Sequence, residues 1–351
     1  MSSTAQRIAH VASYGNPLPG SFIPALAALA RALRERGDTT ALVAADTPRA
    51  SWHGQAAQAF ASFTLARSHA DVYRALRRFS PDIVHVHFVD YTLEASVAAY
   101  VGRARLYWHV HSAMPEAFTP YRRLRQKVKY AVVGGGVRGF VAVSEAMRAE
   151  LQRWGAPGEK IAVVVNAVDT ERFRAPSPSE RAMAREALGI ARQERVALFF
   201  GRDAYLKGGD VLWRALDFNL PIVVLAIGAT VATIRELSKR VRVIDVPASA
   251  DTVALYWAAD VLVAPSRREG TPLVVLEALC CGLPVVASDI PAMAEIAKGT
   301  DAMRLVPNVP EQLARALREE RAGDRAAIAR SARRRYDLGR WVEEMMAVYA
   351  R

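Results

Sequence analysis

Two carboxylates, Glu269 and Glu277, stand eight positions apart where the sequence changes from apolar to polar and back. The apolar residues 260–265 predict a strand before Glu269, and Glu277 falls inside a helix-forming stretch that Gly282 ends. The N-terminal amides of such a helix favour a bound phosphate. Two acceptor carboxylates that flank an anion site indicate a ligand with hydroxyls at both ends and phosphate between them, as in a sugar, a diphosphate and a ribose. Solvated acids on an ordinary strand-turn-helix are the alternative.

Two cations lie on a second predicted strand-to-helix loop. A strand ends at Gly201, Arg202 follows it, and Lys207 with Gly208 opens the next helix. Both cations can reach one diphosphate, and fixed cations stabilise the negative charge that develops when a sugar leaves a phosphate. The alternative is a loop with two surface cations. The chain contains no Asp-x-Asp motif, which is the usual acidic motif for a metal-bridged diphosphate, so we expect no catalytic metal.

Histidines recur at two predicted strands of the first half of the chain. His111 follows the strand expected at 106–110, where a histidine either contacts a ligand or satisfies backbone groups. His85 and His87 lie on the preceding strand, and core roles are favoured for both, although the alternation of side chains places His87 nearer to a ligand. No cysteine or carboxylate accompanies these histidines at ligand spacing, so we expect no zinc site.

Length and composition indicate a globular protein of two domains. The chain has 351 residues, more than one hydrophobic core normally holds. No run approaches the ~18 apolar residues that span a bilayer, and the first residues lack the apolar segment of a signal peptide. Cys280 and Cys281 are adjacent on an apolar stretch and are expected to be reduced core residues. These features predict a cytoplasmic protein.

The net charge is strongly positive, because 47 Lys and Arg stand against 35 Asp and Glu, which gives +12. Such a balance attracts nucleic acid, anionic lipid or phosphorylated substrates. Much of the charge lies in residues 330–335 and 121–130. The latter, read as a helix, interleaves Leu124 and Val128 with cations and can lie on an anionic membrane surface. A solvated helix face is the alternative.

Apolar runs of strand length alternate with helix-forming stretches, which predicts α/β architecture with two doubly wound parallel sheets. The polar stretch 174–181 lies between the two halves and is the linker candidate. Two such domains bind ligands in a cleft at the carboxyl ends of their strands. The expected strands are 8–12, 41–45, 83–87, 106–110, 140–143, 161–165, 196–200, 222–227, 241–246, 261–264 and 285–287. The expected helices include 21–36, 69–79, 91–102, 145–154 and 338–351.

The segment 266–288 resembles the donor site of the retaining glycosyltransferases of family 4, which have the GT-B fold. The family pattern is Glu, seven residues, Glu, then Ala and a Gly-x-Pro-Val-Val tail. The matching residues are Glu269, Glu277, Ala278, Gly282, Pro284, Val285 and Val286. The resemblance implies that Glu269 lies against the donor sugar and that Glu277 binds the ribose hydroxyls.

The cation loop also resembles the family's Gly-Arg…Lys-Gly element. The resemblance implies that Arg202 and Lys207, next to Gly201, hold the donor phosphates. Gly270, Thr271 and Leu273 are expected to donate their amides to the sugar, since Pro272 between them lacks an N–H.

In the first half, the resemblance implies that His111 contacts the transferred sugar from the opposite lobe. The family usually has a Gly-Gly pair after its first strand, whose amides approach donor phosphate or acceptor, but only Gly20 is present here. The sequence departs similarly at 166–169, where Asn-Ala-Val-Asp replaces the common Asn-Gly-Val-Asp.

The likeness covers nearly the whole chain and implies the GT-B architecture, in which two Rossmann-like domains face a central cleft. Residues 1–173 are expected to form the acceptor-side domain, and residues 174–337 the donor domain that binds the nucleotide-sugar. The terminal helix 338–351 is expected to pack back on the first domain.

The function that follows is a retaining, metal-independent transferase. It moves a hexose-type sugar from a UDP- or GDP-linked donor to a hydroxyl acceptor by front-face substitution. The acceptor can be a lipid-linked glycan, a phosphorylated molecule or a small molecule, with peripheral contact to the inner face of an anionic membrane and no specific nucleic acid. The alternatives are a nucleotide-sugar epimerase or hydrolase on the same fold, and a non-catalytic basic protein that binds polyanions. The last would bind nucleic acid with a steep salt dependence.

Overall fold

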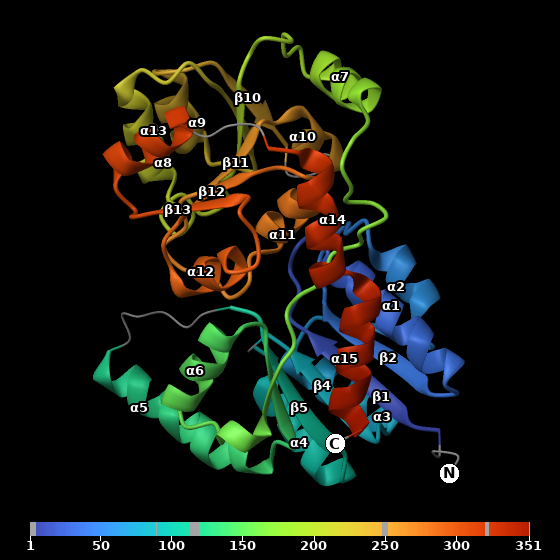
Figure 1. The fold of residues 1–351 in the computed structure, drawn as a ribbon. Coiled ribbons are helices and arrows are strands. Elements are labelled where there is room, and N and C mark those ends of the chain that lie inside the picture. Colours follow the sequence, from blue (N-terminus) through green and yellow to red (C-terminus); the bar gives the residue numbers. More distant parts are fainter. Residues whose placement is uncertain (1–4, 89, 113–118, 248–251, 320–322, 351) are drawn as a thin grey trace. The chain divides into compact units, whose positions relative to one another are not determined.

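Two compact units make up the protein, each built on one parallel sheet (Figure 1). The first unit comprises Met1–Asn166 and Leu338–Arg351, and the second comprises Ala167–Asp337. The structure is a computed structural model. It describes residues 5–88, 90–112, 119–247, 252–319 and 323–350.

The boundary between the units lies earlier than the predicted one, which fell between residues 173 and 174. Residues 167–173 belong to the second unit because their contacts lie there. Val168 donates a backbone hydrogen bond of 2.8 Å to Tyr336. The ring of Phe173 packs edge-on against Tyr256, with 5.9 Å between the ring centroids. These contacts extend the second unit toward the N-terminus.

The expected linker 174–181 is in part the beginning of helix α7 (Pro178–Ala187). Ser177 and Glu180 form a capping box, in which each side chain accepts a hydrogen bond from the other residue's backbone N–H. Pro178 occupies the first helical position, where a missing N–H costs nothing. The linker prediction was therefore wrong from residue 178 onward, because this start signal outweighs the polar composition.

The first unit has a sheet in the order β3-β2-β1-β4-β5-β6-β7, with every pair parallel. The terminal helix α15 belongs to this unit and packs beside α1. Its elements are β1 (Arg7–Ala12), α1 (Phe22–Glu35), β2 (Thr39–Ala45), α2 (His53–Ala59), β3 (Ser62–Ala66), α3 (His69–Phe79), β4 (Ile83–His87), α4 (Thr92–Gly102), β5 (Arg105–Val110), α5 (Pro120–Val128), η1 (Lys129–Val133), η2 (Gly134–Gly136), β6 (Gly139–Ala142), α6 (Glu145–Arg153), η3 (Gly158–Lys160), β7 (Ile161–Val163) and α15 (Leu338–Ala350).

The two faces of this sheet differ in chemistry because side chains alternate along a strand. One face is aliphatic and aromatic: Val84 and Val86 of β4 and Trp108 of β5 pack with α3, α4 and α6 in one core cluster. The opposite face carries His85 of β4, whose Nδ1 lies 2.5 Å from the hydroxyl of Tyr349 on α15. The terminal helix therefore covers the polar face of the sheet.

The second unit has a sheet in the order β10-β9-β8-β11-β12-β13, again parallel throughout. The two sheets together confirm the predicted α/β class. Besides α7, the unit's elements are β8 (Val196–Phe200), α8 (Gly209–Ala215), η4 (Leu216–Phe218), β9 (Val223–Ile227), α9 (Val231–Ser238), β10 (Val243–Val246), α10 (Thr252–Ala258), β11 (Val261–Ala264), α11 (Leu273–Cys280), β12 (Val285–Ser288), α12 (Pro291–Ala297), β13 (Met303–Val306), α13 (Pro310–Glu319) and α14 (Arg325–Tyr336).

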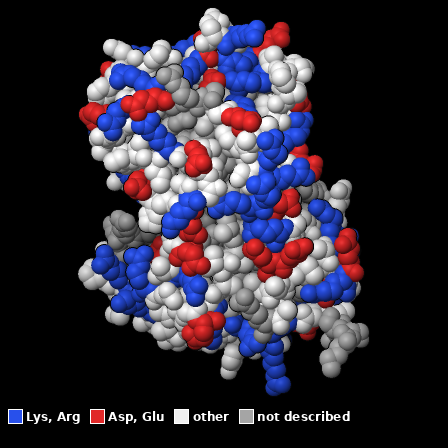
Figure 2. Space-filling view, in the orientation of Figure 1, with Lys and Arg blue, Asp and Glu red and all other residues white. Residues whose placement is uncertain are grey.

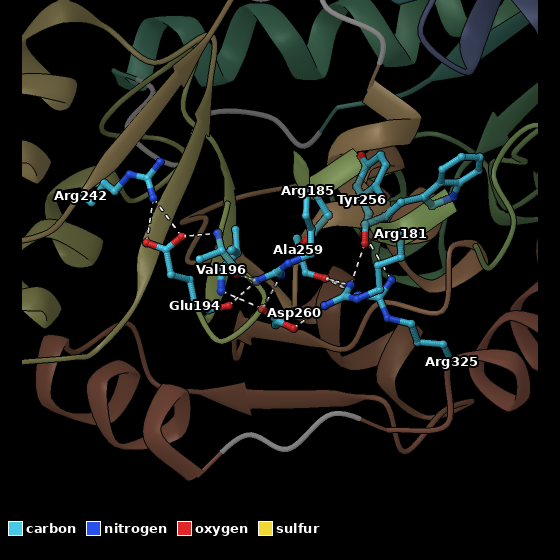
Figure 3. Close-up of polar contacts among 12 residues, drawn as sticks. Arg181, Arg185, Glu194, Val196, Arg242, Tyr256, Ala259, Asp260 and Arg325 are labelled. Carbon is cyan, nitrogen blue, oxygen red and sulfur yellow. Dashed lines mark hydrogen bonds and ion pairs between the residues drawn. The ribbon is translucent and has the colours of Figure 1, made fainter. Parts of the chain in front are cut away.

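A polar network at the amino ends of β8 and β11 holds α7 against this sheet (Figure 3). Asp260 accepts hydrogen bonds from Arg181 at 2.6 Å, from Arg185 at 3.3 Å and from the backbone N–H of Val196 at 2.8 Å. Arg185 is buried, and its guanidinium also donates to the carbonyl oxygens of Ala258 and Ala191, both at 2.8 Å. One carboxylate thus joins a helix and two strands.

The basic segment 121–130 forms a shorter α-helix than predicted. α5 ends at Val128, and a π-helical turn, η1, follows. Lys129 in that turn lies 5.4 Å from the centre of the Trp108 ring, and burial lowers its pKa. Lys129 therefore turns toward the core instead of joining the other cations of the segment. Figure 2 shows Lys and Arg gathered over α5, at the lower left of the view.

Within the described residues, no helix is both long and apolar enough to cross a membrane.

Candidate functional site

Each sheet has a switch point, where the chain begins to add strands on the other side. These points lie between β1 and β4 in the first unit and between β8 and β11 in the second. Loops that follow the two strands at a switch point diverge, and α/β proteins bind ligands there, outside the carboxyl ends of the strands. The predicted site residues follow these strands: Gly20 after β1, Gly201, Arg202 and Lys207 after β8, and residues 269–273 after β11.

Lys207 and Glu269 meet across the switch point of the second unit. The Lys207 Nζ lies 2.6 Å from Oε1 of Glu269, and both side chains are partly buried. The sequence predicted a phosphate contact for the first and a sugar contact for the second, but not that they pair. Arg202 is exposed at the beginning of the same loop, directly after the buried Gly201. A phosphate bound here would compete with Glu269 for the Lys207 ammonium.

Arg267 fastens the two loops to each other. Its guanidinium makes two hydrogen bonds of 2.7 Å to the carboxylate of Asp210, and its backbone N–H donates to Leu206 at 2.9 Å. The guanidinium also stacks on Tyr205, 4.1 Å from the ring centre. The Arg267 guanidinium holds the pKa of Asp210 below its usual value. This clamp fixes the loop that carries Lys207.

Gly208 permits the close approach of these loops. Its φ is +69°, and a Cβ built on it would lie 1.9 Å from the carbonyl oxygen of Pro265. Any side chain would therefore separate the loop after β8 from the loop after β11. The glycine of the Lys-Gly dipeptide before α8 is therefore required for steric reasons in this fold.

Glu277 is buried on α11 and accepts a 2.7 Å hydrogen bond from the hydroxyl of Tyr256 on α10. Burial, followed by the neighbouring Glu277 carboxylate, raises the pKa of Tyr256 well above its usual value. The tyrosine hydroxyl therefore stays protonated and donates to the carboxylate. A buried carboxylate held in this way is oriented for directional hydrogen bonds.

The predicted amide donors lie at the beginning of α11. Gly270 and Thr271 are buried in the loop, Pro272 occupies the cap position, and Leu273 is the first helical residue. The partial positive charge of the helix N-terminus adds to that of Lys207 on the neighbouring loop. Contact of these amides with a sugar stays a prediction.

In the first unit, His111 comes directly after β5 and is partly exposed. Its ring centroid lies 4.6 Å from that of Phe88 and 5.4 Å, edge-on, from that of Phe22 on α1. Burial lowers the pKa of His111 to about 3, so the imidazole is neutral at pH 7. A neutral imidazole donates one hydrogen bond and accepts another.

Gly20 ends the loop between β1 and α1 with a φ of +53°. A Cβ on it would lie 3.0 Å from the hydroxyl of Tyr14, which itself donates to the carbonyl oxygens of Leu18 and Pro19. The positive φ alone is enough to favour a glycine at this position, whether or not a ligand binds there. The predicted contact of Gly20 with a phosphate or acceptor therefore stays a prediction.

His111 belongs to a row of five histidines on the polar face of the first sheet. Strand register sets His10 of β1 beside His85, and His87 of β4 beside His109 of β5. His87 lies between two others: its Nδ1 is 3.3 Å from Nε2 of His111, and its Nε2 is 3.1 Å from Nδ1 of His10. This proximity was not predicted from spacing along the chain, because it arises from neighbouring strands.

Sequence reasoning missed three residues that shape the second-unit site, namely Tyr256, Asp210 and Arg267. The Arg267–Asp210 contact spans 57 positions, and the Tyr256–Glu277 contact spans 21. Neither pair has a local sequence signal. Only the position of Arg267 could have indicated a role, because Arg267 lies two residues before Glu269 on the loop that follows the strand ending at residue 264.

Two family descriptions match the chain, one in each half. Residues 25–172 match Glycosyltransferase Family 4, and residues 194–319 match Glycosyl transferases group 1. The second match contains Arg202, Lys207, Glu269 and Glu277.

The curated relatives include several proteins named D-inositol 3-phosphate glycosyltransferase. That of Kineococcus radiotolerans is 32% identical over 337 residues, which cover 83% of this chain and 75% of the relative. That of Streptomyces bingchenggensis is 32% identical over 266 residues, which cover 67% of this chain and 58% of the relative. The chain therefore spans between about half and three quarters of the length of these relatives.

Solved structures resemble the fold over almost the whole chain. HepE of Anabaena, in complex with UDP and glucose, has a TM-score of 0.83 at 20% identity and covers 98% of this chain and 99% of its own. WaaG, a glycosyltransferase involved in lipopolysaccharide biosynthesis, has a TM-score of 0.70 at 18% identity and covers 96% and 98%. At these identities the likeness shows the fold.

Proposed function

The chain belongs to the glycosyltransferases of group 1 and family 4, with the GT-B fold, and we propose that it is a retaining enzyme. It moves a hexose-type sugar from a nucleotide-diphosphate donor, UDP- or GDP-linked, to a hydroxyl acceptor. The transfer needs no catalytic metal.

The observation that carries this proposal is the pairing of Lys207 with Glu269 at the switch point of the second sheet. A cation for phosphate and a carboxylate for sugar hydroxyls lie within one hydrogen bond of each other. Glu277 follows on α11 as the ribose acceptor, held by Tyr256. Arg202 supplies a second cation at the beginning of the same loop. This order of groups fits a sugar, a diphosphate and a ribose.

The residues favour departure of the diphosphate. In front-face substitution the acceptor oxygen bonds to the anomeric carbon on the face from which the diphosphate leaves. The electrons of the broken C–O bond stay on the departing phosphate oxygen, which also takes the acceptor's proton. Arg202, Lys207 and the helix amides stabilise that new charge, which is larger in the transition state than in the ground state. His111, as a neutral donor, contacts a sugar hydroxyl.

The acceptor is proposed to be a polyol, free, phosphorylated or lipid-linked. The curated relatives are named for D-inositol 3-phosphate, which makes a phosphorylated cyclitol the first acceptor to test. The net charge of +12 favours anionic acceptors in general.

Product analysis tests the proposal. The purified protein is incubated in EDTA with UDP-glucose and other UDP- and GDP-sugars, with and without inositol 3-phosphate and a panel of polyols. The expected result is acceptor-dependent release of nucleotide and a product that keeps the donor's anomeric configuration. Inverted product, or strict dependence on Mg²⁺, would contradict the mechanism. Donor consumption without any acceptor would favour the epimerase or hydrolase alternative, and salt-sensitive nucleic-acid binding without turnover would favour a polyanion-binding protein.

Glu277→Ala should lose about 2 kcal/mol of nucleotide affinity, as expected for removal of a charged hydrogen-bond acceptor. Calorimetric titration with UDP and GDP measures this loss. Because Glu277 is buried and accepts from Tyr256, alanine also removes a core partner. Glu277→Gln, which nearly keeps the side-chain volume, separates loss of charge from loss of packing.

Tyr256→Phe is the matched control for Glu277. It removes the hydroxyl that donates to the carboxylate at 2.7 Å but leaves the carboxylate in place. Nucleotide affinity should fall by less than it does in Glu277→Gln, because the carboxylate that accepts from the ribose is still present. If Glu277→Gln binds nucleotide as well as the wild type, the ribose role is wrong.

A second proposal concerns α5, which we propose docks on an anionic lipid surface. Tyr121, Leu124 and Val128 stand 72, 62 and 50% exposed at positions that share one helix face. Exposed cations accompany them at Arg123 and Lys127. The sequence also has Arg122 in this segment, but the side chain of Arg122 lies outside the described part of the structure. Each cation near an anionic surface contributes about 1 kcal/mol, which suits reversible attachment.

Vesicle sedimentation checks this docking. Vesicles that contain phosphatidylserine should bind the protein at low salt and release it at high salt, and replacing Arg123, Arg125 and Lys127 with Gln should abolish binding. The control removes the same charge elsewhere, by Gln at the exposed Arg192, Arg330 and Arg334 of the second unit. If both variants lose vesicle binding equally, the net charge of the protein and not α5 accounts for the binding. If the wild-type protein does not bind the vesicles at all, α5 is only a solvated helix face.

A further inference from the structure

We propose that His87, His109 and His111 form a binding site for one divalent transition-metal ion of the zinc class. His87 is the last residue of β4, His109 lies on the neighbouring strand β5, and His111 directly follows β5. One ligand nitrogen from each lies within 4.8 Å of the other two. The site lies in the first unit and includes His111, which is also proposed to contact the transferred sugar, whereas the residues proposed for the donor diphosphate lie in the second unit.

The geometry of the strands produces this convergence. His109 and His111 are two positions apart, so their side chains emerge from the same face of the chain. Parallel register sets His87 directly beside His109. The His87 Nδ1 and His111 Nε2 form a hydrogen bond of 3.3 Å, which a bound metal ion would replace. Two nitrogens bound to one tetrahedral zinc at about 2.0–2.1 Å lie about 3.3 Å apart, so this pair already has the spacing of two ligands.

The environment of His109 is a second, independent observation that points to a bound ligand. His109 is completely buried, and neither of its ring nitrogens has a hydrogen-bond partner among the described residues. A neutral imidazole always carries one donor and one acceptor, and a buried polar group without a partner is destabilising. A metal ion can satisfy a ring nitrogen that the described residues leave without a partner.

His111 gives the ion a route to the site, because it is partly exposed at the carboxyl end of the sheet. His10, His85 and His87 form a similar group, but all three are buried. The group that includes His111 is therefore the accessible one.

Imidazole nitrogens define the kind of ion. Zn²⁺, Co²⁺, Ni²⁺ and Cu²⁺ accept imidazole ligands, whereas Mg²⁺ and Ca²⁺ require oxygen. Three neutral protein ligands leave a fourth tetrahedral position for water, as in zinc sites with an open coordination position.

Metal titration of the whole protein tests the site. Zn²⁺ is followed by calorimetry, and Co²⁺ by its visible absorption, which becomes intense in tetrahedral coordination. We expect one Zn²⁺ per chain, a tetrahedral Co²⁺ spectrum that Zn²⁺ displaces, and no binding of Mg²⁺. Failure of the wild-type protein to bind Zn²⁺ or Co²⁺ at micromolar concentration would overturn the proposal without any variant.

His109→Gln should weaken Zn²⁺ binding more than about 100-fold, beyond what loss of an outer partner of a metal ligand costs. His69→Gln is the matched control, since His69 is an exposed histidine of α3 in the same unit, and its affinity should equal that of the wild type. Circular dichroism and thermal unfolding of each variant show that the fold is kept. If His10→Gln abolishes binding while His109→Gln retains it, the ion occupies the inner group and the proposed site is wrong.

Discussion

Replacing Lys207 with alanine should lower kcat by about 100-fold or more, while KM for the donor changes much less. The ammonium lies 2.6 Å from the Glu269 carboxylate, on a loop that Arg267 and Asp210 hold in place. It is therefore held in place before a donor arrives. A group that meets developing charge contributes mainly to the transition state, and removing one such group costs about 10²–10³ in kcat.

Lys239→Ala is the control for Lys207→Ala. Lys239 belongs to the same unit and lies 2.6 Å from Glu236, so this variant also breaks a Lys–Glu pair of equal length. Its kcat should be unchanged. Arg202→Ala should resemble Lys207→Ala, because both cations are proposed to act on the same diphosphate. If Lys207→Ala raises KM and leaves kcat intact, Lys207 binds the ground state only, and its proposed role in bond breaking is wrong.

Asp260→Ala should destabilise the second unit by about 3 kcal/mol, the lower end for a broken buried ion pair, since Asp260 keeps some exposure. The carboxylate serves Arg181, the buried Arg185 and the backbone of Val196 at once (Figure 3). Removing it leaves the Arg185 cation without its carboxylate partner. Urea unfolding, followed by circular dichroism and tryptophan fluorescence, measures the shift of the transition.

Asp217→Ala is the comparison for Asp260→Ala. Asp217 pairs with Arg240 at 2.5 Å, but its side chain is 53% exposed. Exposed ion pairs contribute about 0–1 kcal/mol, so this variant should unfold close to the wild type. Similar shifts for both variants would mean that the network at the amino ends of β8 and β11 adds no more than a surface pair.

The central strands of both sheets were predictable because they are buried on both faces and therefore read as continuous apolar runs. β4 and β8 were predicted to the residue. The missed strands, β3 and β13, are edge strands of their sheets. β3 is largely half-exposed and contains Ser and Thr, and β13 contains Arg304, so neither has the apolar run of a central strand.

The site was predictable where one loop carries its own signal. The Gly-Arg and Lys-Gly elements and the two glutamates each mark a strand-to-helix turn, and the structure places all of them at the β8–β11 switch point or on the helix that follows it. The pairing of Lys207 with Glu269 was not predictable, since it spans 62 positions and depends on the order of strands. The histidine row escaped prediction for the same reason.

The path of the chain determines the order in which the parts of the first unit become available for folding during synthesis. The second unit is inserted into the first, because residues 167–337 separate the seven-stranded sheet from its terminal helix α15. That helix supplies Tyr349, whose hydroxyl meets His85 at 2.5 Å and whose carbonyl oxygen accepts from Arg105 at 2.8 Å. At ~5–20 residues per second, α15 leaves the ribosome about 10 to 30 seconds after the sheet that it covers. The part of the polar face around His85 therefore waits for its cover while the inserted unit, contiguous in sequence, can fold first.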